Sequence, residues 1–251
     1  MSKYVSSQIE PPNLLVSICE TCDSVAIITL NRPALRNTLS IKTLEQLTST
    51  FSELSQSSKT SVLVLHGLGE AFAAGADIKQ LLKLTPSSAV DFSLLGGNLF
   101  RTISNSPKLV IAAIDGFCMG GGLDLALSCD LRYGSDRAIF AHPGANIGII
   151  TGFGGTYRLP QIVGRNKAEQ LFATAERITA SQALEIGLIQ ALANNSAYEL
   201  AIEKATQFAS LGKDFISHIK KLTHLASKNP TLQSKVLLNY YHQLECLKEK
   251  A

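Results

Sequence analysis

Residues 117–130 read FCMGGGLDLALSCD, and they place three consecutive glycines directly before an apolar segment with the pattern of a helix. Glycine loses more conformational entropy on folding than other residues and adds no side chain to a core. Backbone N–H groups in the first turn of a helix have no partner within the helix and lie at the positive end of its dipole. The stretch therefore predicts either an anion-binding turn or tight packing of small residues between helix and sheet.

The segment AAGAD at residues 73–77 repeats this arrangement earlier in the chain. Residues 61–66 and 109–115 are continuous apolar runs, which are typical of strands buried on both faces. Each run leads into a loop of small residues and then into a helical pattern. If the two loops meet, two backbone N–H groups facing one oxygen would form an oxyanion hole.

The order of the predicted elements indicates an α/β protein. Residues 14–19 and 24–30 have the composition of strands, and Ser40 is a predicted cap of the helix that follows. Short strands are expected in residues 131–134 and 138–142, with a glycine-rich loop from about residue 148 to residue 159. From residue 196 the pattern is helical. Alternation of strands and helices with a helical tail is the reason for this class.

Composition limits the functions to consider. Among 251 residues, 45% are hydrophobic and 17% are charged, so we expect a large core rather than disorder. A net charge of +3 is too weak to indicate a nucleic-acid partner, although it suits an anionic small ligand. No apolar run approaches the ~20 residues of a membrane helix, and no targeting pattern precedes residue 14, so we expect no membrane partner and a cytoplasmic protein. The five cysteines and five histidines have no spacing that predicts a disulfide framework or a metal site, and Cys19 and Cys22 are interpreted as a turn.

Several separate motifs resemble one known family. These are AFAAGADIK at residues 71–79, the whole of residues 107–141, and GFGGTYRLPQIVG at residues 152–164. Together they resemble the enoyl-CoA hydratase/isomerase family, also known as crotonases. The resemblance implies a spiral of ββα units over residues 1–195 and a C-terminal helical trimerisation region over residues 196–251. It also implies an acyl-CoA thioester as substrate, no further cofactor, and a homotrimer or a dimer of trimers.

The resemblance assigns roles to individual residues. The backbone N–H groups of Ala76 and Gly121 would hold the thioester oxygen, which explains the glycine run. The other implied contacts belong to coenzyme A, and the residues concerned are Leu35, Arg36, Ala74, Ile78 and Lys79. A solvated surface lysine remains an equal interpretation of Lys79.

The resemblance breaks at the two glutamates that hydratases of this family use as acid and base. The first position is Asp124, one methylene shorter, and a plain polar residue at a helix start is its alternative interpretation. The second position is Gly144, which has no carboxylate. His142 lies two residues earlier on the expected strand, so its side chain would share a face with position 144. We hypothesise that His142 supplies the missing proton or, as a cation, holds a substrate carboxylate; the alternative is a half-buried structural histidine. His242, on the expected last helix, is interpreted as a packing residue, and the alternative that the resemblance implies is a histidine over the acyl pocket.

These observations leave more than one function open. An intact oxyanion hole would stabilise a thioester enolate in any of them. Hydration of a 2-enoyl-CoA needs both acid–base groups, so that activity is in doubt. Double-bond isomerisation needs one base, and decarboxylation of a malonyl-type thioester needs none. A non-catalytic acyl-CoA-binding subunit is the remaining alternative.

Overall fold

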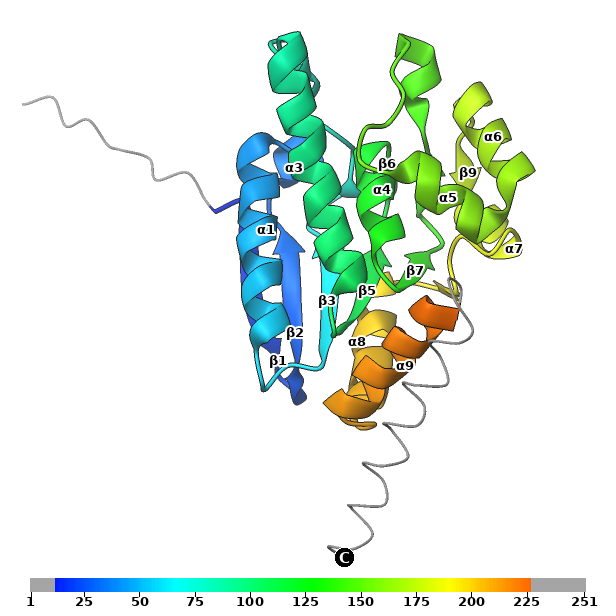
Figure 1. Ribbon diagram of the computed structural model, residues 1–251. Coiled ribbons are helices and arrows are strands. Elements are labelled where there is room, and N and C mark those ends of the chain that lie inside the picture. The colour runs from blue at the N-terminus through cyan, green and yellow to red at the C-terminus, as the bar shows by residue number, and fades with distance from the viewer. Residues whose placement is uncertain (1–11, 227–251) are drawn as a thin grey trace, which may run out of the picture.

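The computed structural model describes residues 12–226, which form two β-sheets and surrounding helices (Figure 1). In this part of the chain the larger sheet has six strands in the order β1-β2-β3-β5-β7-β10. Only the β1–β2 hairpin is antiparallel, and the other pairs are parallel. The strands are β1 (Leu14–Cys19), β2 (Cys22–Leu30), β3 (Val62–Gly67), β5 (Leu109–Ile114), β7 (Leu131–Ser135) and β10 (Ala191–Ala193).

A second sheet orders four short strands as β4-β6-β8-β9 within the same residues. Its strands are β4 (Ala71–Ala73), β6 (Phe117–Met119), β8 (Ile139–Ala141) and β9 (Ile178–Thr179). Three times the chain leaves a strand of the large sheet, turns within a few residues, and enters the small sheet: β3 to β4, β5 to β6, and β7 to β8. A helix or helical turn follows each pair, so the described chain is an α/β spiral of ββα units, as predicted.

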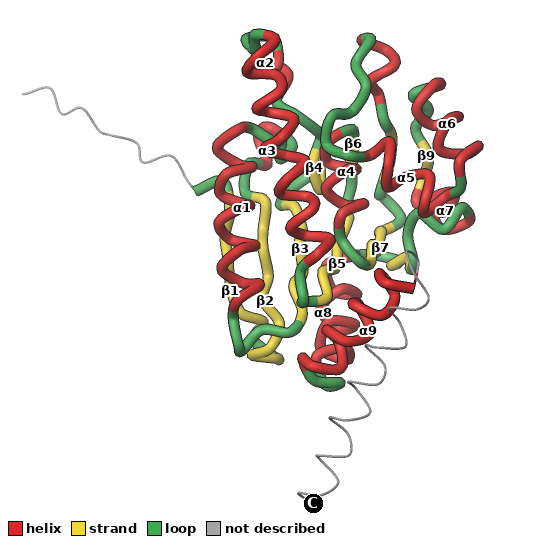
Figure 2. The backbone as a smooth tube through the Cα atoms, in the orientation of Figure 1, coloured by secondary structure: helices red, strands yellow, loops and turns green. Residues whose placement is uncertain are grey.

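The central strands are buried on both faces, as their continuous apolar sequence predicts. Along β3, Leu63 and Leu65 belong to a core cluster with residues of the helices α1 (Ile41–Gln56) and α3 (Pro86–Asn105). Val62 and Val64 belong to a second cluster with three alanines of α8 (Ala197–Ala209). Figure 2 shows α1 and α3 in front of the large sheet. Side chains of successive strand residues therefore fill two separate cores.

The start of α1 confirms the predicted cap. The Ser40 side chain accepts a hydrogen bond from the Thr43 N–H at 3.1 Å, as an N-cap should. The remaining helices and helical turns are η1 (Pro33–Leu35), α2 (Ile78–Leu81), α4 (Gly121–Ser128), η2 (Pro143–Ile147), α5 (Gly155–Val163), α6 (Arg165–Thr174), α7 (Ala180–Glu185) and α9 (Lys213–Ala226). None of the helices between residues 12 and 226 is long and apolar enough to cross a membrane.

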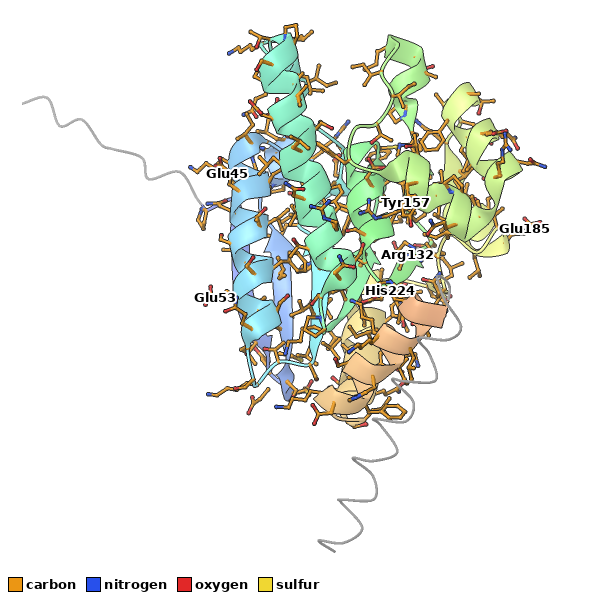
Figure 3. All side chains as sticks on the ribbon, in the orientation of Figure 1. Glu45, Glu53, Arg132, Tyr157, Glu185 and His224 are labelled. Carbon is orange, nitrogen blue, oxygen red and sulfur yellow. The ribbon has the colours of Figure 1, made fainter. Side chains whose placement is uncertain are left out.

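Arg132, labelled in Figure 3, connects the end of α4 with the segment that follows α7. Its buried guanidinium donates to the carbonyl of Leu188 at 2.7 Å and to that of Cys129, just after α4, at 2.9 Å. A cation beside the C-terminal end of α4 also complements the helix dipole. This contact anchors the helix that carries Gly121 and Asp124 at its start.

Two sequence expectations need correction. The glycine-rich segment expected as a loop up to residue 159 contains the start of α5 at Gly155, where the missing side chain leaves room for the Asp124 carboxyl group. The strand expected over residues 138–142 ends at Ala141. Of the predicted C-terminal region, residues 197–226 contain α8 and α9, whereas His242 and the rest lie outside the described residues. Trimerisation through this region stays a prediction.

Candidate functional site

The turn after β4 holds Ala76 against Leu39 in an isolated parallel bridge. The Leu39 N–H donates to the Gly75 carbonyl at 2.8 Å, and the Asp77 N–H donates to the Leu39 carbonyl at 3.2 Å. Because a parallel bridge uses the peptide groups on either side of a residue, the N–H of Ala76 itself points away from Leu39. We find no acceptor for it in the described part of the chain.

The turn after β6 places Gly121 beside Ala76. Gly120 has φ +50°, a conformation that L side chains rarely adopt, and its N–H donates to the Ala141 carbonyl at 2.9 Å. Gly121 then starts α4, so its N–H has no acceptor within the helix. A Cβ atom added to Gly121 would lie 3.5 Å from the Ala76 nitrogen and 3.1 Å from the Phe153 ring. The two predicted oxyanion donors are thus neighbours, and a side chain at Gly121 would crowd them.

These two turns border a cavity of about 870 Å³. Ala74, Ala76, Ile78 and Gly121 line it together with the apolar side chains of Leu81, Leu84, Phe92, Ile147, Ile149 and Phe172. Among its described lining residues, the titratable side chains are those of His142 and Glu169, and there is no lysine or arginine. The cavity therefore suits an apolar chain attached to a group with a polarisable oxygen.

Asp124 lies behind the cavity wall rather than on it. Three residues after Gly121, it shares that face of α4, and its side chain is fully buried. Its Oδ2 accepts a hydrogen bond from the Thr151 hydroxyl. A Cβ atom on Gly155 would come within 2.0 Å of Oδ1, so the carboxyl group occupies the space that a side chain at residue 155 would need. Burial raises the pKa of Asp124 to about 7, although the Thr151 hydrogen bond and the Arg158 charge oppose the shift.

His142 contacts the same carboxyl group from the other side. Its Nε2 lies 3.4 Å from Asp124 Oδ1, within ion-pair distance, but the geometry is not that of a hydrogen bond. The buried imidazole packs against the Phe172 ring at 4.7 Å between centroids. Burial lowers the pKa of His142 to about 4, so the side chain is neutral at pH 7. A cationic role is therefore not supported.

The prediction that His142 and residue 144 lie on one face of a strand is wrong. His142 precedes the 3₁₀ turn η2 and is not on a strand, so the alternation of strand faces does not relate the two residues. Both nevertheless line the cavity. A Cβ atom at Gly144 would lie 2.0 Å from the Ile149 carbonyl oxygen, so the backbone fills the space of any side chain there.

The residues expected to contact coenzyme A lie partly in the cavity wall and partly on the surface outside it. The Arg36 carbonyl accepts a hydrogen bond from the Ala74 N–H at 2.9 Å, which joins the loop of Leu35 and Arg36 to the cavity. The side chains of Leu35, Ile78 and Lys79 are exposed. The Arg36 guanidinium lies 5.5 Å from the Phe117 ring and 3.6 Å from Glu70. Of the five residues, Ala74 and Ile78 line the cavity, whereas Leu35, Arg36 and Lys79 do not.

Sequence reasoning missed Thr151 and Phe153. Thr151 bonds to Asp124, 27 residues earlier, and the Phe153 ring packs against Gly121 and against Phe92 and Phe100. The only local signal is a threonine at residue 151 followed by a phenylalanine among the glycines of residues 152–155. Their partners follow from the tertiary fold, which no spacing in this segment encodes.

Fold and site together define an α/β protein of repeated ββα units in which two helix-start turns meet over an apolar cavity. A sequence model of the family described as enoyl-CoA hydratase/isomerase matches residues 20–248. The chain therefore belongs to this family, the crotonases, and is an acyl-CoA enzyme.

Relatives and solved structures agree with this assignment. The chain is 40% identical over 190 residues to the short-chain-enoyl-CoA hydratase of Clostridium acetobutylicum, with 73% of each protein aligned. It is 39% identical over 173 residues to the crotonyl-CoA hydratase of Syntrophomonas wolfei, covering 68% of this chain and 66% of that protein. The crystal structure of the enoyl-CoA hydratase from Bacillus anthracis superposes with a TM-score of 0.86 at 30% identity, covering 95% of this chain and 96% of the other.

Proposed function

We propose that this enzyme transfers a proton at the acyl chain of an enoyl-CoA thioester, with a single buried carboxyl group as acid and base. The thioester oxygen is held by the N–H groups of Ala76 and Gly121, which stabilise the enolate that forms. Asp124 takes up and returns the proton. The observation that carries the proposal is the buried Asp124 carboxyl group one helical turn from the unpartnered Gly121 N–H.

The raised pKa of Asp124 supports acid–base chemistry over simple binding. A carboxyl group with a pKa of about 7 is present in both protonation states near neutral pH, which suits a group that must accept and then donate a proton. Binding of an acyl-CoA needs no buried carboxyl group behind the cavity wall, and burying one is costly. The non-catalytic subunit is therefore the weaker alternative.

We propose isomerisation of a 3-enoyl-CoA to a 2-enoyl-CoA as the principal reaction, with hydration of a 2-enoyl-CoA as a slower one. Family resemblance assigns a glutamate to the position of Gly144. Because that glutamate is absent, Asp124 alone must act as both acid and base. Isomerisation removes a proton from C2 and returns one to C4, which one carboxylate can do in turn. The names of the aligned relatives favour hydration, so both reactions need measurement.

Decarboxylation finds no specific support. A malonyl-type substrate brings its own free carboxylate into the cavity, and the described lining residues include no lysine or arginine to bind that carboxylate. His142 is neutral at pH 7. An apolar wall around an unpaired carboxylate is unfavourable.

The test is to give the purified protein three substrates in parallel. We expect turnover of trans-3-hexenoyl-CoA, slower hydration of crotonyl-CoA, and no release of CO₂ from methylmalonyl-CoA. Thermal stabilisation by all three thioesters without any product would contradict the proposal and favour the binding subunit. Release of CO₂ as the fastest reaction would favour the decarboxylase.

Three further expectations belong with this proposal. Leu35, Arg36, Ala74, Ile78 and Lys79 contact coenzyme A, and Lys79 would meet a phosphate. The chain assembles as a homotrimer or a dimer of trimers, and it acts in the cytoplasm. Sedimentation analysis of the purified chain tests the assembly.

A further inference from the structure

Asp124 meets the cavity through other side chains, because it does not line the cavity itself. Its Oδ1 lies against Gly155 and the His142 ring, and its Oδ2 receives the Thr151 hydroxyl. The Phe153 ring covers the neighbouring face of Gly121. Thr151 does line the cavity, so this residue connects the buried carboxyl group with the cavity.

The hydrogen bonds of Thr151 fix the direction of its hydroxyl. A hydroxyl group has one donor and two acceptor positions. The donor goes to Asp124 Oδ2, and one acceptor position receives the Phe153 N–H at 3.5 Å. The methyl group lies toward Gly155, where an added Cβ would be 2.9 Å from Thr151 Cγ2. One acceptor position thus remains for a proton arriving from the cavity.

The segment that carries Thr151 is anchored on both sides. The Ser93 hydroxyl of α3 donates to the Gly152 carbonyl at 2.8 Å, and Arg158 donates to the Phe153 carbonyl at 3.0 Å. Arg158 also acts electrostatically on Asp124. These contacts hold the hydroxyl in place, which proton transfer over hydrogen-bond distance requires.

We propose that Thr151 is a catalytic residue whose hydroxyl relays the proton between the acyl chain and Asp124. The inference rests on the proposed function. In isomerisation, the C2–H bond breaks and its proton passes to Thr151 Oγ1 while the hydroxyl proton of Thr151 passes to Asp124 Oδ2. The electron pair forms the dienolate, whose oxygen is held by Ala76 and Gly121. Thr151 then gives a proton to C4 and regains one from Asp124, so no proton is gained or lost overall.

Thr151 and Asp124 together span the distance that a longer acidic side chain would cover alone. Aspartate is one methylene shorter than glutamate, and the threonine hydroxyl supplies the missing reach. This division leaves the carboxyl group buried with its raised pKa while the hydroxyl meets the substrate. The relay also removes the need for a carboxylate at Gly144, where the Ile149 carbonyl leaves no room.

The test compares Thr151→Val, which removes the hydroxyl but keeps the shape, with Thr151→Ser, which keeps the hydroxyl. We expect Thr151→Val to lower kcat for 3-hexenoyl-CoA about 100-fold with KM changed less than threefold, as for loss of a general acid–base group. Thr151→Ser should stay within about fivefold of the wild type. The matched control is Thr48→Val on α1, whose hydroxyl donates to the Leu44 carbonyl away from the cavity, and it should leave kcat unchanged.

Two readouts work without turnover of an enoyl substrate. The first is exchange of the α-hydrogens of butyryl-CoA in D₂O, which needs only the enolate site and the relay, and it should fall with Thr151→Val. The second is the pH titration of the Asp124 carboxyl stretch in infrared difference spectra against Asp124→Asn. Because the Thr151 hydrogen bond lowers the pKa of Asp124, Thr151→Val should raise that pKa.

The outcomes separate the relay from the proposed function. A Thr151→Val protein with kcat and exchange within twofold of the wild type overturns the relay while the function stands. A Thr151→Ser protein as slow as Thr151→Val also overturns it, since the hydroxyl then does not matter. A wild type that exchanges α-hydrogens through Thr151 but converts no enoyl-CoA overturns the proposed function alone. A wild type without either activity overturns both.

Discussion

Two sides of the cavity are built in different ways. The side with Ala76 and Gly121 consists of backbone, and its N–H groups are positioned by a β-bridge and by a helix start. The other side, within residues 142–155, depends on side chains: His142 and Thr151 contact Asp124, and the Phe153 ring lies beside Gly121. In the proposed function, the backbone side binds the thioester oxygen and the side-chain side transfers the proton.

The difference concerns how each side tolerates change. A backbone donor is lost only if the residue has no N–H or if the turn moves, so most substitutions there act through crowding. Each partner of the buried carboxyl group, by contrast, contributes a hydroxyl, a ring or a charge that a substitution removes directly. We therefore expect substitutions on the backbone side to slow every reaction of the enzyme. Substitutions around Asp124 should change the relative rates of isomerisation and hydration.

The largest effect is expected from Gly121→Pro, which removes the N–H from the oxyanion site. Proline is favoured at the first position of a helix, and Gly121 holds that position in α4, so the helix should persist. Loss of one oxyanion donor costs about 10²–10³-fold in kcat. Steady-state kinetics with 3-hexenoyl-CoA measure the loss, and circular dichroism checks the fold.

Gly121→Ala is the matched control, because it adds a side chain at the same place but keeps the N–H. Its methyl group would lie 3.1 Å from the Phe153 ring, which must move by a few tenths of an ångström. We expect a loss of less than about tenfold, well below the range for a missing donor. Equal losses in the two variants would assign the effect to crowding and contradict the role of the Gly121 N–H.

Asp124→Asn should have the second largest effect, a loss of about 10²-fold or more in isomerisation and hydration. The base is the ionised carboxylate, and burial places its pKa at about 7. The wild-type rate should therefore rise as the pH increases through 7 and level off above it. Initial rates from pH 5.5 to 9 test this, and the residual rate of the asparagine variant should not show the rise. A pH profile shared by both proteins would remove Asp124 as the base.

The turns that carry Ala76 and Gly121 were predictable from sequence, whereas the surroundings of Asp124 were only partly so. Strand-to-helix turns of small residues are local patterns, and they predict two loops with free N–H groups. The family resemblance, rather than the spacing, assigned Ala76 and Gly121 within those loops, and the structure places the two residues side by side. The glycines at 144 and 155 are different, since each is explained by a distant group: the Ile149 carbonyl and the Asp124 carboxyl group. Thr151 likewise acquires its partner through the packing of α5 on α4. Such contacts form only when the elements assemble, so spacing alone did not indicate them.

Gly144→Ala should lower stability by about 3 kcal/mol, as for forced overpacking. The new Cβ atom would lie 2.0 Å from the Ile149 carbonyl oxygen, so the backbone of η2 must shift. Gly144→Glu meets the same obstacle, and we expect it to lose stability rather than to gain hydration of crotonyl-CoA. Gly97→Ala is the control, since nothing lies within 4 Å of its Cβ position in α3, and it should stabilise by up to about 1 kcal/mol.

Urea denaturation of the three variants measures these changes in unfolding free energy. A Gly144→Ala protein as stable as the wild type would contradict the prediction, because the backbone around Ile149 would then have moved without cost.

The smallest effect concerns the opposed titrations of His142 and Asp124. The folded-state pKa of His142 is about 4 instead of 6.5, so between these values the unfolded chain binds a proton that the folded chain does not, and stability falls as the pH falls. Asp124, with a folded-state pKa of about 7 instead of 3.8, binds a proton first in the folded state, so its contribution to stability rises as the pH falls. The two contributions oppose each other between pH 4 and 6.5.

His142→Gln removes one contribution and leaves the other. Relative to the wild type, this variant should gain about 2 kcal/mol of unfolding free energy between pH 6.5 and pH 5, at ~1.4 kcal/mol per unit of pH. Asp124→Asn should change in the opposite direction over the same range, and the double variant should follow the wild type closely. Denaturant titrations at half-unit pH steps measure all four proteins. Parallel pH profiles for the wild type and His142→Gln would mean that His142 titrates normally and is available as a cation, which would restore the substrate-carboxylate role that its buried position argues against.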